Sequence, residues 1–469
     1  MRIGRLLLVL VSPFAALLVP NGVLRAQAGQ GRPCEVVITG VERGSDTTRF
    51  TSVMTATGAR HMFVGGGVDA ACAGQGNRLL ADSAEHYADR GLLILFDNVR
   101  YTEPTMQLTS NRMYYYTNEE RLVAEGDVKA KTSTGTRFEG PRIEYFRAKP
   151  GQRAAPRWVA TGRPFVRMSP AETGAPPVAP DAPAPAAPRP GGTPAPAADS
   201  VDLTANIVIS ENDSLMWASG DVIIERVDIR ATADSATLDN GIGFARLLED
   251  PLIVGRGERP FTLDGVVIDL WSRERQLERV LSSGEAEVVS DSLTLTADTI
   301  DLRFADQRME RVFTWGGRSR ADAPAQRIDA DSLDIIMPGQ RLREVRAVGD
   351  ALASSVADTA LVITDERDWI RGDTIVALFD TTGAAAAVAD TTTSSQPAMR
   401  EVVATGAARA FYQMSASDSA KALPNISYNR GRIIKVSFVE GAAERVDVID
   451  RASGIYLEPI KTDTTTRRP

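Results

Sequence analysis

Apolar and polar residues alternate along most of this chain with a period of two. In the segment 298–304, isoleucine, leucine and phenylalanine occupy every second position, and threonine, aspartate and arginine occupy the positions between them. Val222 and Ile224 repeat the pattern after Gly220. Short polar turns such as 305–308 and 337–340 separate the alternating segments. This alternation predicts β-strands with one buried face.

A short motif recurs along the chain: an apolar residue, any residue, a small residue, any residue and glycine. The first copy is Leu122-Val123-Ala124-Glu125-Gly126. Further copies end at Gly162, Gly220, Gly284, Gly316, Gly349 and Gly406. The spacing from Gly284 to Gly316 is 32 residues and that from Gly316 to Gly349 is 33. Glycine without a Cβ tolerates a positive φ or a tight bend, so we interpret these residues as structural rather than chemical.

A second motif, a small residue followed by aspartate and serine or threonine, lies between these glycines. Its copies have their aspartates at Asp82, Asp234, Asp298, Asp331 and Asp373. One unit of about 30–36 residues therefore holds several short strands and cannot bury its apolar face alone. Stacked units can do so. The pattern predicts an all-β stacked antiparallel jellyroll or solenoid, built in two blocks.

Composition divides the chain into five segments. We expect a signal peptide at 1–28, a repeat block at 29–168, a Pro/Ala-rich linker at 169–200 and a second repeat block at 201–460. The second block contains an Ala/Thr-rich loop at 381–398, and a disordered tail covers 461–469.

The first segment has the features of an export signal. Arg2 and Arg5 precede the short apolar run 6–18, and Ala26-Gln27-Ala28 fits a cleavage site. The alternative is a membrane anchor, but the run is shorter than the ~20 residues that span a bilayer. We therefore expect an exported, periplasmic protein that can also associate peripherally with the outer membrane.

Export gives the two cysteines a structural meaning. Cys34 and Cys72 are 38 positions apart, and oxidising compartments favour disulfides. A bridge closing such a loop contributes roughly 3–4 kcal/mol in the chain-entropy model. The alternative is two buried thiols, and either arrangement is structural.

Charge and missing motifs exclude several functions. A formal net charge of -8 disfavours nucleic-acid binding. The sequence has no nucleophile elbow, phosphate-binding loop or zinc-protease motif, so we expect no catalytic residues, cofactor or metal site. His61 and His86 are expected to be surface or packed residues. Asp329, Asp331 and Asp334 lack the spacing of a calcium loop, and no charged cluster of a polysaccharide lyase recurs on one face.

Several segments resemble the OstA-like family, the organic solvent tolerance protein N-terminal domain. The resemblance rests on 63–68, 80–85, 113–115 and 122–128, and on the repeated Gly-Asp-Val and Ala-Asp-Ser triplets near 220 and 234. The family includes the periplasmic bridge protein of lipopolysaccharide transport and the N-terminal domain of the outer-membrane assembly protein. The resemblance implies a β-jellyroll that carries lipopolysaccharide between inner- and outer-membrane machinery. This chain is longer than typical bridge proteins, and we expect no barrel like that of the assembly protein within it, because no series of strands with apolar outer faces remains.

An apolar interior would hold acyl chains, because each CH₂ removed from water contributes roughly 0.8 kcal/mol. The candidate interior residues are Val128, Val222, Ile224, Val254, Ile300, Leu302, Leu333 and Ile335. For each of them the alternative is ordinary core packing.

Expected partners are lipopolysaccharide or another amphiphilic lipid, together with other jellyroll transport proteins that pair through edge strands, including copies of this chain. The competing hypothesis is an exported structural or adhesive repeat protein without lipid cargo.

Overall fold

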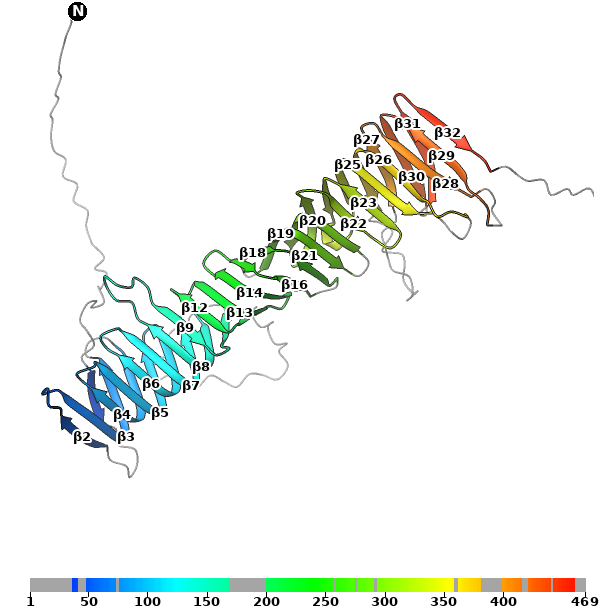
Figure 1. Ribbon diagram of the computed structural model, residues 1–469. Helices are drawn as coiled ribbons and strands as arrows, with labels where there is room; N and C mark the ends of the chain where they lie inside the picture. Colours follow the sequence, from blue (N-terminus) through cyan, green and yellow to red (C-terminus); the bar gives the residue numbers. More distant parts are fainter. Residues whose placement is uncertain are drawn as a thin grey trace, which may run out of the picture.

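The computed structural model describes residues 36–40, 48–72, 76–168, 200–256, 259–274, 276–290, 293–357, 362–380, 399–415, 421–439 and 442–459. These residues form 32 strands, all within one hydrogen-bonded sheet, and a single 3-10 turn, η1 (Pro338–Gln340). The strands run across the axis of a long rod, and position in the sequence follows position along the rod (Figure 1). The predicted all-β stacked fold is confirmed.

The strands before the predicted linker are β1 (Val36–Gly40), β2 (Arg49–Met54), β3 (Arg60–Cys72), β4 (Arg78–Tyr87), β5 (Leu92–Glu103), β6 (Met106–Tyr116), β7 (Arg121–Thr132), β8 (Thr136–Phe146), β9 (Arg157–Thr161) and β10 (Phe165–Met168). The next strands are β11 (Val201–Thr204), β12 (Ile207–Glu211), β13 (Leu215–Glu225), β14 (Ile229–Asp239), β15 (Phe244–Leu248), β16 (Leu252–Gly255), β17 (Phe261–Asp264), β18 (Val267–Arg273), β19 (Gln276–Ser290), β20 (Leu293–Ala305) and β21 (Arg308–Trp315). The last are β22 (Ser319–Asp322), β23 (Gln326–Ala330), β24 (Ser332–Ile336), β25 (Glu344–Val356), β26 (Arg367–Phe379), β27 (Met399–Thr405), β28 (Arg409–Met414), β29 (Asn425–Arg430), β30 (Ile433–Val439), β31 (Ala442–Ile449) and β32 (Ser453–Leu457).

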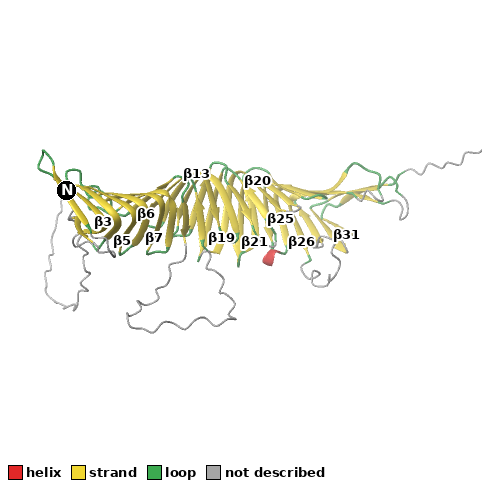
Figure 2. Cartoon of the chain, turned by 90° about the horizontal axis from the view of Figure 1, so that it is seen from below, coloured by secondary structure: helices red, strands yellow, loops and turns green. Residues whose placement is uncertain are grey.

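The strands form two layers because each long strand bends in its middle. The first half of β19 pairs with β18, and its second half pairs with β17. We call the layer that contains β18 and β21 the first layer, and the layer that contains β17 and β22 the second layer. The edge at which strands cross between layers is the folded edge. At the opposite edge, the mouth, strands end in turns that form a first and a second lip (Figure 2).

The recurring glycines lie at the folded edge. Gly349 has a φ of 85°, and the register of β25 shifts between Val348 and Ala351. The residue after it, Asp350, also has a positive φ, of 42°. Two consecutive residues of positive φ bend the strand here. The same pairing of a glycine and its successor occurs at 126–127, 162–163, 220–221, 284–285, 316–317 and 406–407.

The second motif meets the first at this edge. The backbone N–H of Asp331 donates to the carbonyl of Gly349 at 3.0 Å, and that of Asp373 donates to Gly406 at 3.1 Å. Asp298 and Gly316 make the same bond at 3.2 Å. At these three positions the two sequence motifs therefore meet in one hydrogen-bonded bend of the sheet, whereas the N–H of Asp234 donates to the carbonyl of Glu249 at 3.0 Å.

The sheet continues across the predicted linker. β9 pairs with β12 in the first layer, and β10 pairs with β11 in the second. Arg167 also makes a bidentate ion pair with Asp202, directly opposite it, at 2.7 Å. Residues 169–199 lie outside the described part, as do 1–35, 381–398 and 460–469. The signal peptide, the linker, the inserted loop, the tail and the exact domain limits stay predictions.

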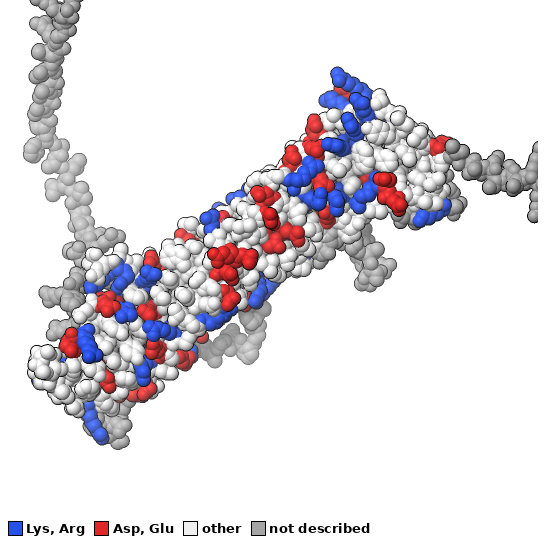
Figure 3. Space-filling view, viewed as in Figure 1, with Lys and Arg blue, Asp and Glu red and all other residues white. Residues whose placement is uncertain are grey.

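Outer surfaces carry ion pairs between neighbouring strands, and basic and acidic residues intermingle on the face seen in Figure 3. Arg246 is paired to Asp269 at 2.7 Å, and Arg320 to Asp329 at 2.8 Å, each directly across a strand pair. Opposite charges at such positions stabilise a sheet by a few tenths of a kcal/mol up to ~1 kcal/mol. In the ranges described, no helix is long and apolar enough to span a bilayer.

Candidate functional site

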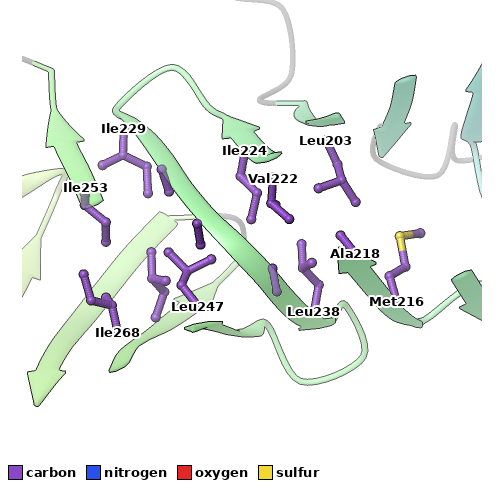
Figure 4. Packing of buried hydrophobic residues seen from close by; sticks show 14 of the residues in the cluster. Leu203, Met216, Ala218, Val222, Ile224, Ile229, Leu238, Leu247, Ile253 and Ile268 are labelled. Atoms are coloured by element: carbon purple, nitrogen blue, oxygen red, sulfur yellow. The ribbon is translucent and has the colours of Figure 1, made fainter. Parts of the chain in front are cut away.

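The interior between the layers contains seven of the eight residues proposed from the sequence. They are Val128, Val222, Ile224, Ile300, Leu302, Leu333 and Ile335, all at most 5% exposed. Figure 4 shows Val222 and Ile224 beside Leu203 within this apolar packing. Val254 differs, since it is only partly buried and the buried residues of β16 are its two neighbours, Ile253 and Gly255. Alternation along the strand therefore places Val254 on the outer face.

The packing of the interior changes along the rod. Among its largest fully buried side chains are Tyr101, Tyr115, Phe138 and Trp158, all before the predicted linker. The rings of Phe138 and Trp158 stack with centroids 5.0 Å apart. Later strands fill the same space mainly with alanine, valine, isoleucine and leucine. The N-terminal interior is thus a packed aromatic core, whereas the C-terminal interior is aliphatic.

A buried ionic network closes the mouth of the N-terminal half. Arg147, on the first lip, lies 3.1 Å from Glu103 at the second-layer end of β5 and 2.9 Å from Glu120 on the first lip. The side chains of these two glutamates are only 5% and 10% exposed. We call Glu103, Glu120 and Arg147 the clasp, because they tie the second lip to the first.

Three tyrosines complete the hydrogen bonding of the clasp. Tyr101 and Tyr145 donate to the two carboxylate oxygens of Glu103 at 2.8 and 2.7 Å, and Tyr115 donates to Glu120 at 3.0 Å. Burial raises the pKa of all three phenols well above the ordinary value, with the nearby glutamates adding to the shift. The phenols therefore remain protonated donors, and each buried carboxylate has several partners.

A second polar contact crosses the mouth beside the clasp. The hydroxyl of Thr134, on the second lip, donates to Asp213, on the first lip, at 3.4 Å. Burial raises the pKa of Asp213, although hydrogen bonds from Thr134, Trp158 and Thr132 oppose this shift. The carboxylate is thus held in a site that disfavours its charge.

Asp213 also borders the cavity in the middle of the rod, which has a volume of about 530 Å³. Its apolar wall includes Met168, Val201, Ile224, Leu238, Phe244 and Leu270. Two further polar contacts cross the mouth at its rim: Asn240 donates to the sulfur of Met168 at 3.0 Å, and Arg226 donates to Ser272 at 3.0 Å. Arg226 is also paired with Asp228 at 2.9 Å. The cavity can accept an apolar group through a polar rim.

Beyond the cavity, the first lip becomes apolar. Inward-facing residues at consecutive strand ends and turns are half-buried and pack against the core; they are Phe304, Met309, Met337, Leu342, Phe379, Met399 and Phe438. We call this row the apolar lip. Across the mouth, the ring of Phe304 lies 6.3 Å from that of Phe261 on the second layer. Methionine side chains adapt readily to irregular apolar partners, so this lip suits a flexible hydrocarbon chain.

The Asp213 carboxylate predicts a specific pH effect on stability. Its raised pKa means that the folded protein binds this proton more tightly than the unfolded chain, whose value is near 3.8. The charge therefore lowers the free energy of unfolding at neutral pH, and this penalty disappears as pH falls toward 3.8. We expect Asp213→Asn to be more stable than the wild type at pH 7, with the difference shrinking toward pH 4. Thermal unfolding of both proteins at the two pH values measures this, and an equal difference at both would contradict it.

Other residues considered from the sequence have structural roles. Cys72 is disulfide-bonded, and its sulfur accepts a hydrogen bond from Asn77 at 3.2 Å; Cys34 lies outside the described residues, so the pairing of the two stays a prediction. The ring of His61 is hydrogen-bonded to Asp89 at 2.8 Å, and burial lowers the pKa of His86.

The aspartates weighed as calcium ligands are spread over separate contacts. Asp329 is paired with Arg320, Asp334 with Arg311 at 2.7 Å, and Asp331 lies at the folded edge near Arg318. The described ranges contain no group of three residues placed to hold a metal ion.

Sequence reasoning missed the clasp and the apolar lip. Glu103 and Arg147 are far apart in the chain, and nothing in their neighbours marks them as partners. The apolar lip did leave a signal, since phenylalanine or methionine recurs at the inward position next to a polar turn, as at Phe304, Met337 and Phe379.

Comparisons with known proteins give limited likeness. No family model matches the chain. No curated protein matches it either. Among solved structures, the chain is similar to LptH of Pseudomonas aeruginosa, described as the LptA homologous periplasmic component of the lipopolysaccharide transport device. The two share 19% identity over 30% of this chain and 92% of LptH, with a TM-score of 0.22. The fold described above therefore rests on the strand pairing of this chain itself.

Proposed function

We propose that this protein is a periplasmic, non-enzymatic scaffold for lipid transport, which holds acyl chains along the apolar lip and in the adjoining cavity. The observation that carries the proposal is the row of half-buried phenylalanine, methionine and leucine side chains at the mouth of the C-terminal half. Hydrocarbon that binds along this row is removed from water, which contributes roughly 0.8 kcal/mol of favourable free energy for each CH₂. Lipopolysaccharide is the cargo that the sequence resemblance implies.

Similar side chains on successive strands suit movement as well as binding. A chain that shifts from one repeat to the next exchanges one apolar contact for an equivalent one, so its free energy changes little. The clasped N-terminal half offers no such path while its aromatic core stays packed. We therefore place bound acyl chains between the cavity and the C-terminal end.

The two ends of the rod support a role in a larger assembly. β2 pairs only with β3, and β32 pairs only with β29, within the described chain. All residues of both strands are exposed, including Phe50 at 55% and Ile455 at 59%. Such apolar edge strands favour pairing with another sheet. We propose that jellyroll proteins of the same machinery, or further copies of this chain, dock at these ends.

Lipid carried by the purified protein tests the proposal. We expect the mature chain, produced in a host with a lipopolysaccharide-containing outer membrane, to retain lipid detectable by mass spectrometry of an organic extract. The double variant Met309→Asp/Phe379→Asp should lose most of it, because a carboxylate at the lip is poorly compatible with hydrocarbon. Val254→Asp is the control, since it adds a carboxylate on the outer face and not at the lip, and it should retain the lipid.

Two results would count against lipid transport. One is a wild-type protein that carries no lipid, which would favour the structural or adhesive alternative. The other is an equal loss of lipid in Val254→Asp and in the double variant, which would show that the apolar lip is not the binding surface.

A further inference from the structure

We propose that Arg308, Arg341 and Arg343 form a phosphate-binding site on the outside of the apolar lip, so that the cargo is an acylated lipid with a phosphorylated head group. This inference rests on the proposed function and names the class of lipid. Three features support the site: the position of the arginines on the lip, their lack of ion-pair partners, and the affinity of guanidinium groups for phosphate.

The three arginines alternate with residues of the apolar lip. Arg308 directly precedes Met309 at the start of β21, and Arg341 and Arg343 flank Leu342. Met309 and Leu342 pack against the core, while all three arginines are exposed. Met309 and Leu342 therefore each have at least one exposed arginine next to them in the chain.

Backbone hydrogen bonds hold these arginines on adjacent turns. The segment 337–343 is joined to β21 through Met337, whose N–H donates to the carbonyl of Glu310 at 2.9 Å, and through Gly339, whose N–H donates to the Glu310 carboxylate at 2.8 Å. On its other side, the N–H of Phe379 donates to the carbonyl of Arg343 at 3.0 Å. The start of β21, the turn that contains η1 and the end of β26 thus form one continuous stretch of lip.

The charges of these arginines are free. Neighbouring arginines form ion pairs with carboxylates: Arg311 lies 2.7 Å from Asp334, and Arg346 lies 2.9 Å from Glu344. Within the described ranges, Arg308, Arg341 and Arg343 have no carboxylate within ion-pair distance. The exposed Asp306 is the acidic residue of the turn that precedes Arg308. Glu310, whose carboxylate accepts from the Gly339 N–H, and the exposed Asp380 also lie on this stretch, so the site is defined by three guanidinium groups without an ion-pair partner and not by an excess of positive charge.

Arginine suits this position because its planar guanidinium binds phosphate through two hydrogen bonds at once. An amphiphile whose acyl chains lie on Met309 and Leu342 places its head group next to these guanidinium groups. A neutral or cationic head group gains nothing there, whereas a phosphate gains charge-assisted hydrogen bonds. The clasped N-terminal mouth lacks this combination, since Arg147 is already bound by Glu103 and Glu120.

Binding of two lipids with the same acyl chains, dipalmitoyl phosphatidic acid and dipalmitoylglycerol, tests the proposal on the full mature chain. We expect wild-type protein to bind phosphatidic acid at least about tenfold more tightly. The triple variant Arg308→Gln/Arg341→Gln/Arg343→Gln should lose this preference and bind dipalmitoylglycerol as the wild type does. Inorganic phosphate alone, the third probe, should bind far more weakly than phosphatidic acid, because it gains nothing from the apolar lip.

A charge-matched control separates a site from a general effect of charge. Arg60→Gln/Arg100→Gln/Arg137→Gln removes three exposed arginines of the N-terminal half and should keep the preference. Equal loss in both triple variants, or no loss in the lip variant, overturns the phosphate site while leaving lipid transport standing. If wild-type protein binds neither lipid, the proposed function fails, and the phosphate site fails with it. Circular dichroism of each variant verifies the fold before binding is compared.

Discussion

Replacing Arg147 by methionine is expected to lower the free energy of unfolding by about 3–5 kcal/mol, as for a buried ion pair that loses one partner. The variant leaves Glu103 and Glu120 with side chains 5% and 10% exposed and without their cation. Methionine keeps the packing volume but supplies no positive charge. Urea unfolding measures the change, and hydrogen exchange of residues 101–147 should show that it starts at the N-terminal mouth.

Two further variants test whether the loss comes from uncompensated charge. Arg78→Met removes an ion pair with Asp69 whose arginine side chain is 61% exposed, and should cost less than about 1 kcal/mol. Adding Glu103→Gln and Glu120→Gln to Arg147→Met should recover most of the lost stability, since the buried charges are then gone. If Arg147→Met costs no more than Arg78→Met, the clasp does not hold the mouth shut.

The clasp also separates two regions of the rod whose mouths are built differently. Ionic contacts and aromatic packing close the N-terminal half at the clasp. The C-terminal half has a mouth crossed by apolar contacts such as Phe304 with Phe261, which can separate without leaving a buried charge exposed. An acyl chain can replace such a contact with a similar one. The cavity lies between the N-terminal region, where polar contacts cross the mouth, and the C-terminal region, where the apolar lip begins.

The stacked fold could be predicted because its signals are local. Alternation within five to seven residues specifies a strand with one buried face, and glycines mark many of the folds of the sheet, with spacings of 32 and 33 residues from Gly284 to Gly349. The same reasoning failed at Val254 because the segment 252–255 is Leu-Ile-Val-Gly, apolar at every position. Alternation then carries no information about which face is inside, and the pairing of β16 with β14 and β17 decides it.

The contacts across the mouth could not be predicted, because they depend on which turns become neighbours in space. Arg147 reaches Glu103 across 44 positions, and Asp213 reaches Thr134 across 79. Neither the alternation with a period of two nor the repeat of about thirty residues indicates which of these residues become neighbours. Continuity of the sheet was hidden for a similar reason, since a Pro/Ala-rich segment gives no sign that the strands on its two sides pair with each other, as β10 and β11 do.

The folded edge leads to the second large effect, from Gly349→Ala. An alanine there would retain a φ of 85°, which costs an L-residue roughly 1–2 kcal/mol. Its Cβ would also lie 2.6 Å from Cγ and 2.7 Å from Cβ of Asp331, so one of the two strands must move. We expect a total loss of about 3–4 kcal/mol in the free energy of unfolding, measured in urea, within the range of severe single substitutions.

Gly317→Ala separates the two causes, because Gly317 has a φ of 81° and nothing within 4 Å of the position of a Cβ. It should show the backbone strain alone. Adding Asp331→Gly to Gly349→Ala removes the crowding atoms, so the two substitutions should be strongly non-additive in a double-mutant cycle. The bond from the Asp331 N–H to the Gly349 carbonyl survives in that variant, since both groups belong to the backbone. Equal losses from Gly349→Ala and Gly317→Ala would mean that the aspartate motif does not constrain the glycine motif, and that the two recur together for another reason.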